Sequence, residues 1–104
     1  MRVIWQTIAK RQRDIIAEYI RQEFGAKRRN LFLQEVRKTT RMLSRSPNIG
    51  SIDSLFSERP IAYRSVIING LSKLVYRIDN EVIHIVAFWD TRQEPESQAA
   101  KIKE

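Results

Sequence analysis

Residues 61–89 constrain the fold most, because three β-prone runs are separated there by two turn signals. Asn69-Gly70 is a strong signal for a two-residue hairpin turn, since both residue types readily adopt a positive φ. Asp79-Asn80 is a weaker signal of the same kind. Three β runs joined by two tight turns predict an antiparallel meander, and a sheet of this kind needs a partner layer over its apolar face.

Two-residue turns at both signals fix a register and separate the two faces of the meander. They pair Arg64 with Val75, and Val75 with His84. One face is then apolar and should pack on helices: Ile61, Tyr63, Ser65, Ile67, Leu74, Tyr76, Ile78, Ile83, Ile85, Ala87 and Trp89. The other mixes aliphatic residues with cations: Ala62, Arg64, Val66, Ile68, Leu71, Lys73, Val75, Arg77, Val82, His84, Val86 and Phe88. Such a mixed face indicates a partner surface, although β-propensity alone also explains its valines.

The first half of the chain predicts a strand followed by two helices. Residues 1–5 are β-prone, and residues 7–24 show apolar side chains at helical spacing up to the stop signal Gly25. A second helix is predicted over 27–46, so that the short link makes an antiparallel hairpin. We therefore expect an α+β fold of order β-α-α-β-β-β, with a single domain over residues 1–95. Residues 96–104 form a tail, either a short helix or disordered.

Positive charge is concentrated in the first half. The chain carries 19 Lys or Arg against 12 Asp or Glu, and residues 1–46 account for 12 of these cations but only 4 of the acids. On the predicted second helix, Lys38, Arg41 and Arg45 lie opposite Val36 at 100° per residue. Such a field favours polyanions or an acidic protein partner. A solvated basic surface that keeps the protein soluble is the alternative interpretation.

Several classes of protein are excluded or disfavoured. The chain has no cysteine and one histidine, so neither a thiolate metal site nor a disulfide is available, and we predict no metal or cofactor. The four-residue apolar patch near the start is too short for a signal peptide. No apolar run approaches the roughly 20 residues that a membrane span needs. We expect a soluble, cytoplasmic protein.

A cationic cluster is the only candidate for chemistry. Arg64, Lys73, Arg77 and Arg92 are able to hold a phosphate backbone. Cleaving RNA also needs a group that exchanges a proton, and on the mixed face only His84 qualifies. A mid-strand histidine is more often a packed polar residue than a catalytic one.

The chain resembles the RelE/ParE superfamily of bacterial type II toxins, which includes plasmid stabilisation proteins, over about residues 1–95. The resemblance lies in "VIWQTIA", "IIAEYI" and "MLSRSPNIG", and above all in "YRSVIINGLSKLVYRIDNEVIHIVAFWDTRQEP". It implies a helical hairpin packed on an antiparallel sheet. It also implies an antitoxin partner that wraps the toxin with an extended or helical segment, giving a hetero-oligomer.

Only some of the functional residues of the ribonuclease members of the superfamily have a counterpart in this chain. Arg64 matches a strand cation that contacts RNA, Lys73 falls at a catalytic arginine, and Arg92 matches the last functional arginine. Val66 stands where some members have a catalytic lysine, and Asp90 where others have a histidine. No tyrosine follows Arg92. The cations are kept, whereas most groups that transfer protons are missing.

This pattern favours a ParE-like toxin that inhibits growth by binding DNA gyrase. The alternative is a RelE-like, ribosome-dependent mRNA endoribonuclease, whose catalytic residues would be Arg64, Lys73, His84 and Arg92; enzymatic activity is thus left open. A third alternative is a basic nucleic-acid-binding domain without a toxin role, which the lack of aromatics within the basic strip disfavours. Candidate partner-binding residues are Val66, Val75, Arg77, Val82, Val86, Lys38, Arg41 and Arg45.

Overall fold

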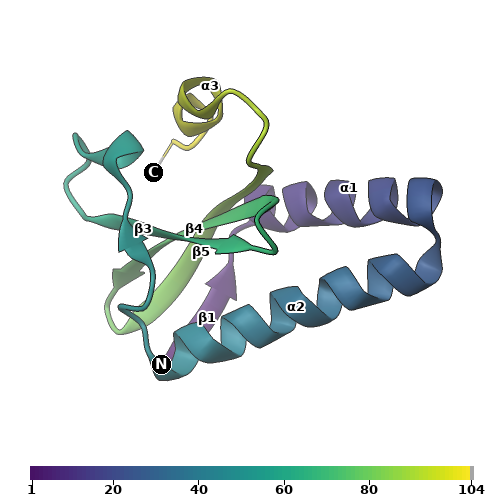
Figure 1. Cartoon of the computed structure of the whole chain (residues 1–104). Coiled ribbons are helices and arrows are strands. Elements are labelled where there is room, and N and C mark those ends of the chain that lie inside the picture. The colour runs from purple at the N-terminus through teal and green to yellow at the C-terminus, as the bar shows by residue number, and fades with distance from the viewer. Residues whose placement is uncertain (104) are drawn as a thin grey trace.

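The computed structural model describes residues 1–103 as a five-stranded sheet with three α-helices (Figure 1). Its elements are β1 (Arg2–Trp5), α1 (Thr7–Phe24), α2 (Ala26–Arg45), β2 (Ser51–Ile52), a 3-10 turn η1 (Ser54–Phe56), β3 (Tyr63–Ile68), β4 (Ser72–Asp79), β5 (Val82–Asp90) and α3 (Pro95–Ala100). The strand order is β1-β5-β4-β3-β2. β1 runs parallel to β5, and the other pairs are antiparallel. The predicted α+β class and the order β-α-α-β-β-β are confirmed, with β2, η1 and α3 as additional elements. The sheet is mixed and not wholly antiparallel as expected, because β1 is parallel to β5.

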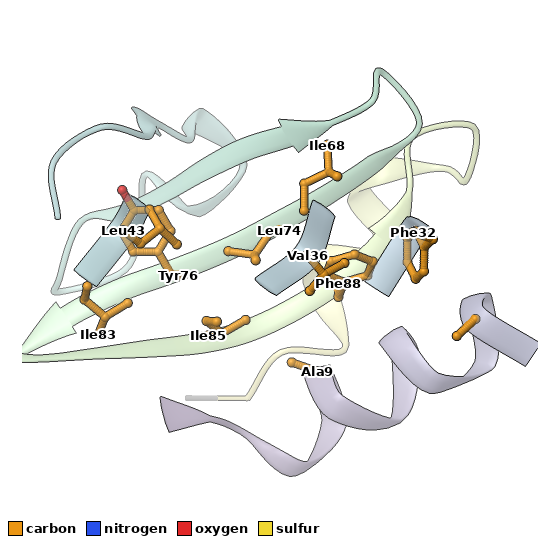
Figure 2. Close-up of a cluster of buried hydrophobic side chains, with 11 residues drawn as sticks. Ala9, Phe32, Val36, Leu43, Ile68, Leu74, Tyr76, Ile83, Ile85 and Phe88 are labelled. Atoms are coloured by element: carbon orange, nitrogen blue, oxygen red, sulfur yellow. The ribbon is translucent and has the colours of Figure 1, made fainter. Parts of the chain in front are cut away.

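The helical hairpin turns at Gly25 and covers one face of the sheet. Gly25 has a φ of 93°, which favours glycine, and it ends α1 where α2 begins. Figure 2 shows the resulting core, in which Val36 and Leu43 of α2 and Ala9 of α1 meet the side chains of β4 and β5. Leu43, Ala9 and Leu74 have no exposed surface. The apolar stripe predicted for each helix is therefore the stripe that faces the sheet.

The predicted register of β3 is wrong by one residue. Ile68 pairs with Ser72 instead of Leu71, and Ser65, not Arg64, pairs with Val75. The expected turn does form, because Asn69 and Gly70 both have positive φ and the Leu71 amide donates to the Ile68 carbonyl. Leu71 is an additional unpaired residue, and its carbonyl accepts from Thr91 at the end of β5.

This slip exchanges the faces of β3. Val66 and Ile68 pack with the helices, whereas Tyr63 belongs to the cluster on the other side of the sheet. The second turn also moves, since Asn80 and Glu81 take the positive φ values and Asp79 pairs with Val82. The pairing of β4 with β5 is thus shifted by two residues from the predicted register. Because side chains alternate with a period of two, the faces of β4 and of the first half of β5 stay as predicted.

A β-bulge reverses the faces of the second half of β5 relative to the prediction. The pairing slips between Val75/Tyr76, so that Tyr76 pairs with Ile85 but Val75 pairs with Ala87. The extra residue is Val86, and a bulge residue of this kind reverses the alternation that follows it. Phe88 consequently packs under the helices, while Ala87 and Trp89 lie on the opposite face.

The face opposite the helical hairpin is covered by the chain itself. Phe56 of η1 and Ala99 of α3 pack there, with Ile102 after it, against the side chains of β4 and β5. Figure 1 shows α3 and the 54–56 turn on one side of the sheet and α2 on the other. Arg59 ties the two covering segments together, because its Nη2 donates to the Ile102 carbonyl at 2.7 Å while its guanidinium lies over Phe56. Residues 95–102 are thus part of a second core.

Candidate functional site

The four candidate catalytic residues do not converge on one place. Arg64 pairs with Tyr76 and so belongs to the helix-facing side of the sheet, whereas Lys73 and His84 project from the opposite side. Arg64 Nη1 donates to the Gly50 carbonyl at 2.7 Å and to the Asn48 carbonyl at 3.2 Å. Its guanidinium is therefore engaged in fixing the loop after α2.

Lys73 is held in an ion pair under an aromatic ring. Its Nζ lies 2.6 Å from Asp53 Oδ2 and 5.5 Å from the centre of the Trp89 ring. The side chain of Asp53 is 5% exposed and that of Lys73 is 17% exposed. Asp53 also begins η1 by accepting from the Leu55 amide. The pair fastens the loop before β3 to the second core.

The pKa of Asp53 lies below its ordinary value. Burial acts to raise this pKa, but hydrogen bonds from Lys73, the Leu55 amide and Ser65 together outweigh burial. Asp53 is therefore a carboxylate at neutral pH and keeps Lys73 paired. A lysine in this state is a poor stabiliser of charge on an approaching phosphate.

His84 lies in the middle of β5, half-buried. It pairs with Arg77 on β4 and with Ile4 on β1. Its Nδ1 is 3.1 Å from the amide nitrogen of Gln6, so the imidazole and the amide share one hydrogen bond. The imidazole is fixed by a neighbouring amide and lies on the other side of the sheet from Arg64.

Arg92 is the most exposed candidate, with 73% of its side chain accessible. Its guanidinium forms a two-pronged ion pair with Asp90, with Nη2 to Oδ2 at 2.6 Å and Nε to Oδ1 at 3.0 Å. The hydrogen bonds from Arg92 hold the pKa of Asp90 below its ordinary value, against a smaller effect of burial. This pair stands at the end of β5 as a surface feature.

The candidate partner-binding valines are less accessible than the predicted register implied. Val75 and Val86 are 0% and 1% exposed, because Phe56 of η1 and the residues Ala99 and Ile102 pack over the face on which both valines lie. Val66 packs against the helix-side core. Arg77 and Val82 are half-buried on the face opposite the helices. The expectation of an open, mixed sheet face is thus corrected: the chain covers most of that face itself.

Sequence reasoning missed a groove of about 610 Å³ between the helical hairpin and the β3–β4 turn. Its walls include Tyr19 and Phe24 of α1, Leu31 of α2 and Leu71 of the turn, which are 49–65% exposed. Asp90 and Arg92 lie at its edge. Figure 1 shows that the connected ends of α1 and α2 project beyond the sheet, which leaves this part of the hairpin without a strand to pack on. The sequence did contain a signal for this groove: apolar residues near Gly25 lie at the ends of the two helices that extend past the sheet, so the sheet cannot bury them.

Lys38, Arg41 and Arg45 are all exposed on α2, and we call them the α2 cationic strip. None of the three makes an ion pair with another of the residues that the structure describes. Some cations elsewhere are paired, for example Arg13 with Asp14 and Arg21 with Glu18. The predicted position of the strip, opposite the buried Val36, is confirmed.

Two further classes of site are absent from the described residues. Within residues 1–103, no group of three or more His, Asp or Glu side chains is arranged to hold a metal ion. No helix in that range is long and apolar enough to cross a membrane.

Comparison with known proteins places the chain in a family. Residues 3–95 match the family described as ParE toxin of type II toxin-antitoxin system, parDE. Among solved structures, the fold is similar to that in the chromosomal ParDE TA system from P. aeruginosa, with a TM-score of 0.70 and 19% sequence identity over 86% of this chain and 95% of that one. No curated protein sequence matches significantly. The match over residues 3–95 shows that this chain belongs to the ParE toxin family of type II toxin-antitoxin systems.

Proposed function

We propose that this toxin inhibits growth by binding DNA gyrase, without hydrolytic chemistry of its own. The observation that carries the proposal is the separation of the four residues that RNA cleavage would require. Arg64 and His84 lie on opposite sides of the sheet, and Lys73 is ion-paired to a buried carboxylate. A ribonuclease site needs its phosphate-binding cations and its proton-transfer group within contact of one substrate.

The hydrogen bonds and ion pairs of these cations support inhibition by binding to a target more than catalysis. Arg64 donates to two loop carbonyls, and Arg92 donates twice to Asp90. Stabilising a transition state would require these cations to be presented to the substrate in advance, free of competing partners. A binding inhibitor requires only a complementary surface, and the exposed groove and α2 provide candidate surfaces.

Gyrase supercoiling tests this proposal directly. Purified toxin should stop the conversion of relaxed plasmid to supercoiled plasmid, and adding the cognate antitoxin before the toxin should restore the reaction. Supercoiling that proceeds normally at toxin concentrations that arrest growth would exclude gyrase as the target. The RelE-like alternative would then be supported by mRNA cleavage on ribosomes.

We further infer that the antitoxin occupies the groove between the hairpin and the β3–β4 turn. A toxin of a two-component system must be neutralised by its partner, and large exposed apolar side chains gathered around a groove are a feature of protein-binding sites. Tyr19, Phe24 and Leu31 supply apolar anchors, which suit the apolar face of a helix or of an extended segment. The mixed sheet face, which the sequence favoured, is instead occupied by η1 and α3.

A further inference from the structure

The α2 cationic strip is a surface that neither the core nor the groove accounts for. Lys38, Arg41 and Arg45 share one side of α2, with Val36 buried on the side opposite. Arg45 lies seven positions after Lys38, which corresponds to about 10 Å along a helix. A single strand of duplex DNA presents one phosphate per about 3.4 Å, so this length corresponds to about three phosphates.

The strip is electrostatically free to bind an anion. Within residues 1–103, its three cations have no acidic partner, in contrast to Arg13, Arg21 and the pairs on the sheet. Glu35 is the one acidic residue of α2. The helix fixes the spacing of the three Cα atoms along this exposed side, so the cations stand in one row.

The composition of α2 favours nucleic acid over an acidic protein. A protein interface usually has an apolar centre with aromatic anchors in addition to any arginine anchors, and the single aromatic of α2, Phe32, is buried in the core. Backbone contacts to nucleic acid depend mainly on charge and need no apolar centre. Two of the three cations are arginines, whose planar forks match phosphate oxygens.

We propose that the α2 cationic strip binds the phosphate backbone of duplex nucleic acid without regard to sequence. The strip has no aromatic side chain for stacking on bases, so single-stranded binding by base stacking is not expected. Such binding adds a nucleic-acid contact to the protein contacts proposed above. It does not depend on gyrase being the target of the toxin.

The test measures binding of the full chain to a labelled 25-bp duplex by fluorescence anisotropy over a series of KCl concentrations. Three phosphate contacts predict a slope of log K against log [KCl] of about −2.7, which is a loss of affinity of about 40-fold between 50 and 200 mM salt. The variant Lys38→Gln/Arg41→Gln/Arg45→Gln should lose most of this slope. A second duplex of unrelated sequence should bind with equal affinity.

A matched control removes the same charge elsewhere. Arg2→Gln/Lys10→Gln/Arg11→Gln takes three exposed cations from β1 and α1, and glutamine is a good helix former at the five helical positions. The proposal requires that this control keep the slope of the unmodified chain. Equal losses in the two variants would mean attraction by net charge alone and would overturn it. Strip-dependent binding of poly-glutamate as tight as that of the duplex would instead indicate an acidic polypeptide ligand, and would also overturn it. Circular dichroism verifies that both variants are folded.

Discussion

Lys73 Nζ lies 2.6 Å from Asp53 Oδ2, and this ion pair joins the loop before β3 to the ring of Trp89. The pair occupies the position where the resemblance to ribonuclease toxins placed a catalytic cation. The role of Lys73 is therefore structural, because the negative charge of the buried Asp53 carboxylate would lack a partner if Lys73 moved to a substrate. Stability measurements on this pair therefore test the assignment of Lys73.

Asp53→Asn should destabilise the fold by about 3 kcal/mol, since removing one partner of a buried pair leaves the other charge uncompensated. Urea unfolding monitored by Trp fluorescence measures this loss. Asp53→Asn/Lys73→Met should recover part of it, because a buried pair can be replaced by apolar packing. Strictly additive effects of Asp53→Asn and Lys73→Met would show that the two residues do not interact in solution.

Acid should weaken the fold in part through Asp53. Its pKa in the folded chain lies below the ordinary value of 3.8, so its contribution to stability is complete above about pH 4 and is lost as the pH falls through the folded pKa. The free energy of unfolding should therefore drop less steeply below pH 4 in Asp53→Asn than in the unmodified chain. Asp90→Asn is the matched control, because Asp90 also has a lowered pKa but lies at the surface, and its effect should be smaller.

Gly50→Ala should destabilise the fold by about 1–3 kcal/mol through overpacking. A Cβ at this position would lie 2.7 Å from Tyr76 Oη and 2.9 Å from the Ser65 carbonyl. The Gly50 amide also donates to Tyr76 Oη, which in turn donates to the Pro47 carbonyl. Thermal unfolding checks this prediction, and a smaller penalty for Gly50→Ala in a Tyr76→Phe background would identify the hydroxyl as the obstacle. An unchanged melting temperature in Gly50→Ala would contradict the packing described.

Phe24→Ala should weaken antitoxin binding at least tenfold while leaving the toxin folded. Phe24 is 65% exposed beside the groove, so its ring contributes little to the core but can anchor a partner. Ile52→Ala is the control, because Ile52 is also 65% exposed but lies on β2, and it does not line the groove. Isothermal titration with the cognate antitoxin measures both affinities. Equal affinities for the two variants would place the antitoxin elsewhere.

The helices and the first half of β5 could be predicted from the sequence, because one clear periodicity governs each of them. Ile83 and Ile85 face the helices as their alternation indicates. The candidate site could not be predicted as reliably, since it depended on register. One unpaired residue at Leu71 and one bulge residue at Val86 reversed the faces of neighbouring segments, and neither leaves a signal in local propensity.

Long-range contacts were the other missing information. Asp53 lies in residues 46–60, which are rich in Ser, Pro, Asn and Gly and which the sequence indicates only as a loop. Its pairing with Lys73 depends on how that loop crosses the sheet. The covering of Val75 and Val86 by residues 99–102 is equally non-local. The groove beside Phe24 follows from the length of the hairpin relative to the sheet, which no single segment encodes.

The most direct test of inhibition by binding is an mRNA cleavage assay on translating ribosomes, read by primer extension with purified toxin and with His84→Gln. We predict no codon-dependent cleavage by either protein, and unchanged growth inhibition by His84→Gln, because His84 is bonded to Gln6 on the opposite side of the sheet from Arg64. Codon-dependent cleavage that disappears in His84→Gln would contradict this account and would make His84 the general acid or base of a ribonuclease.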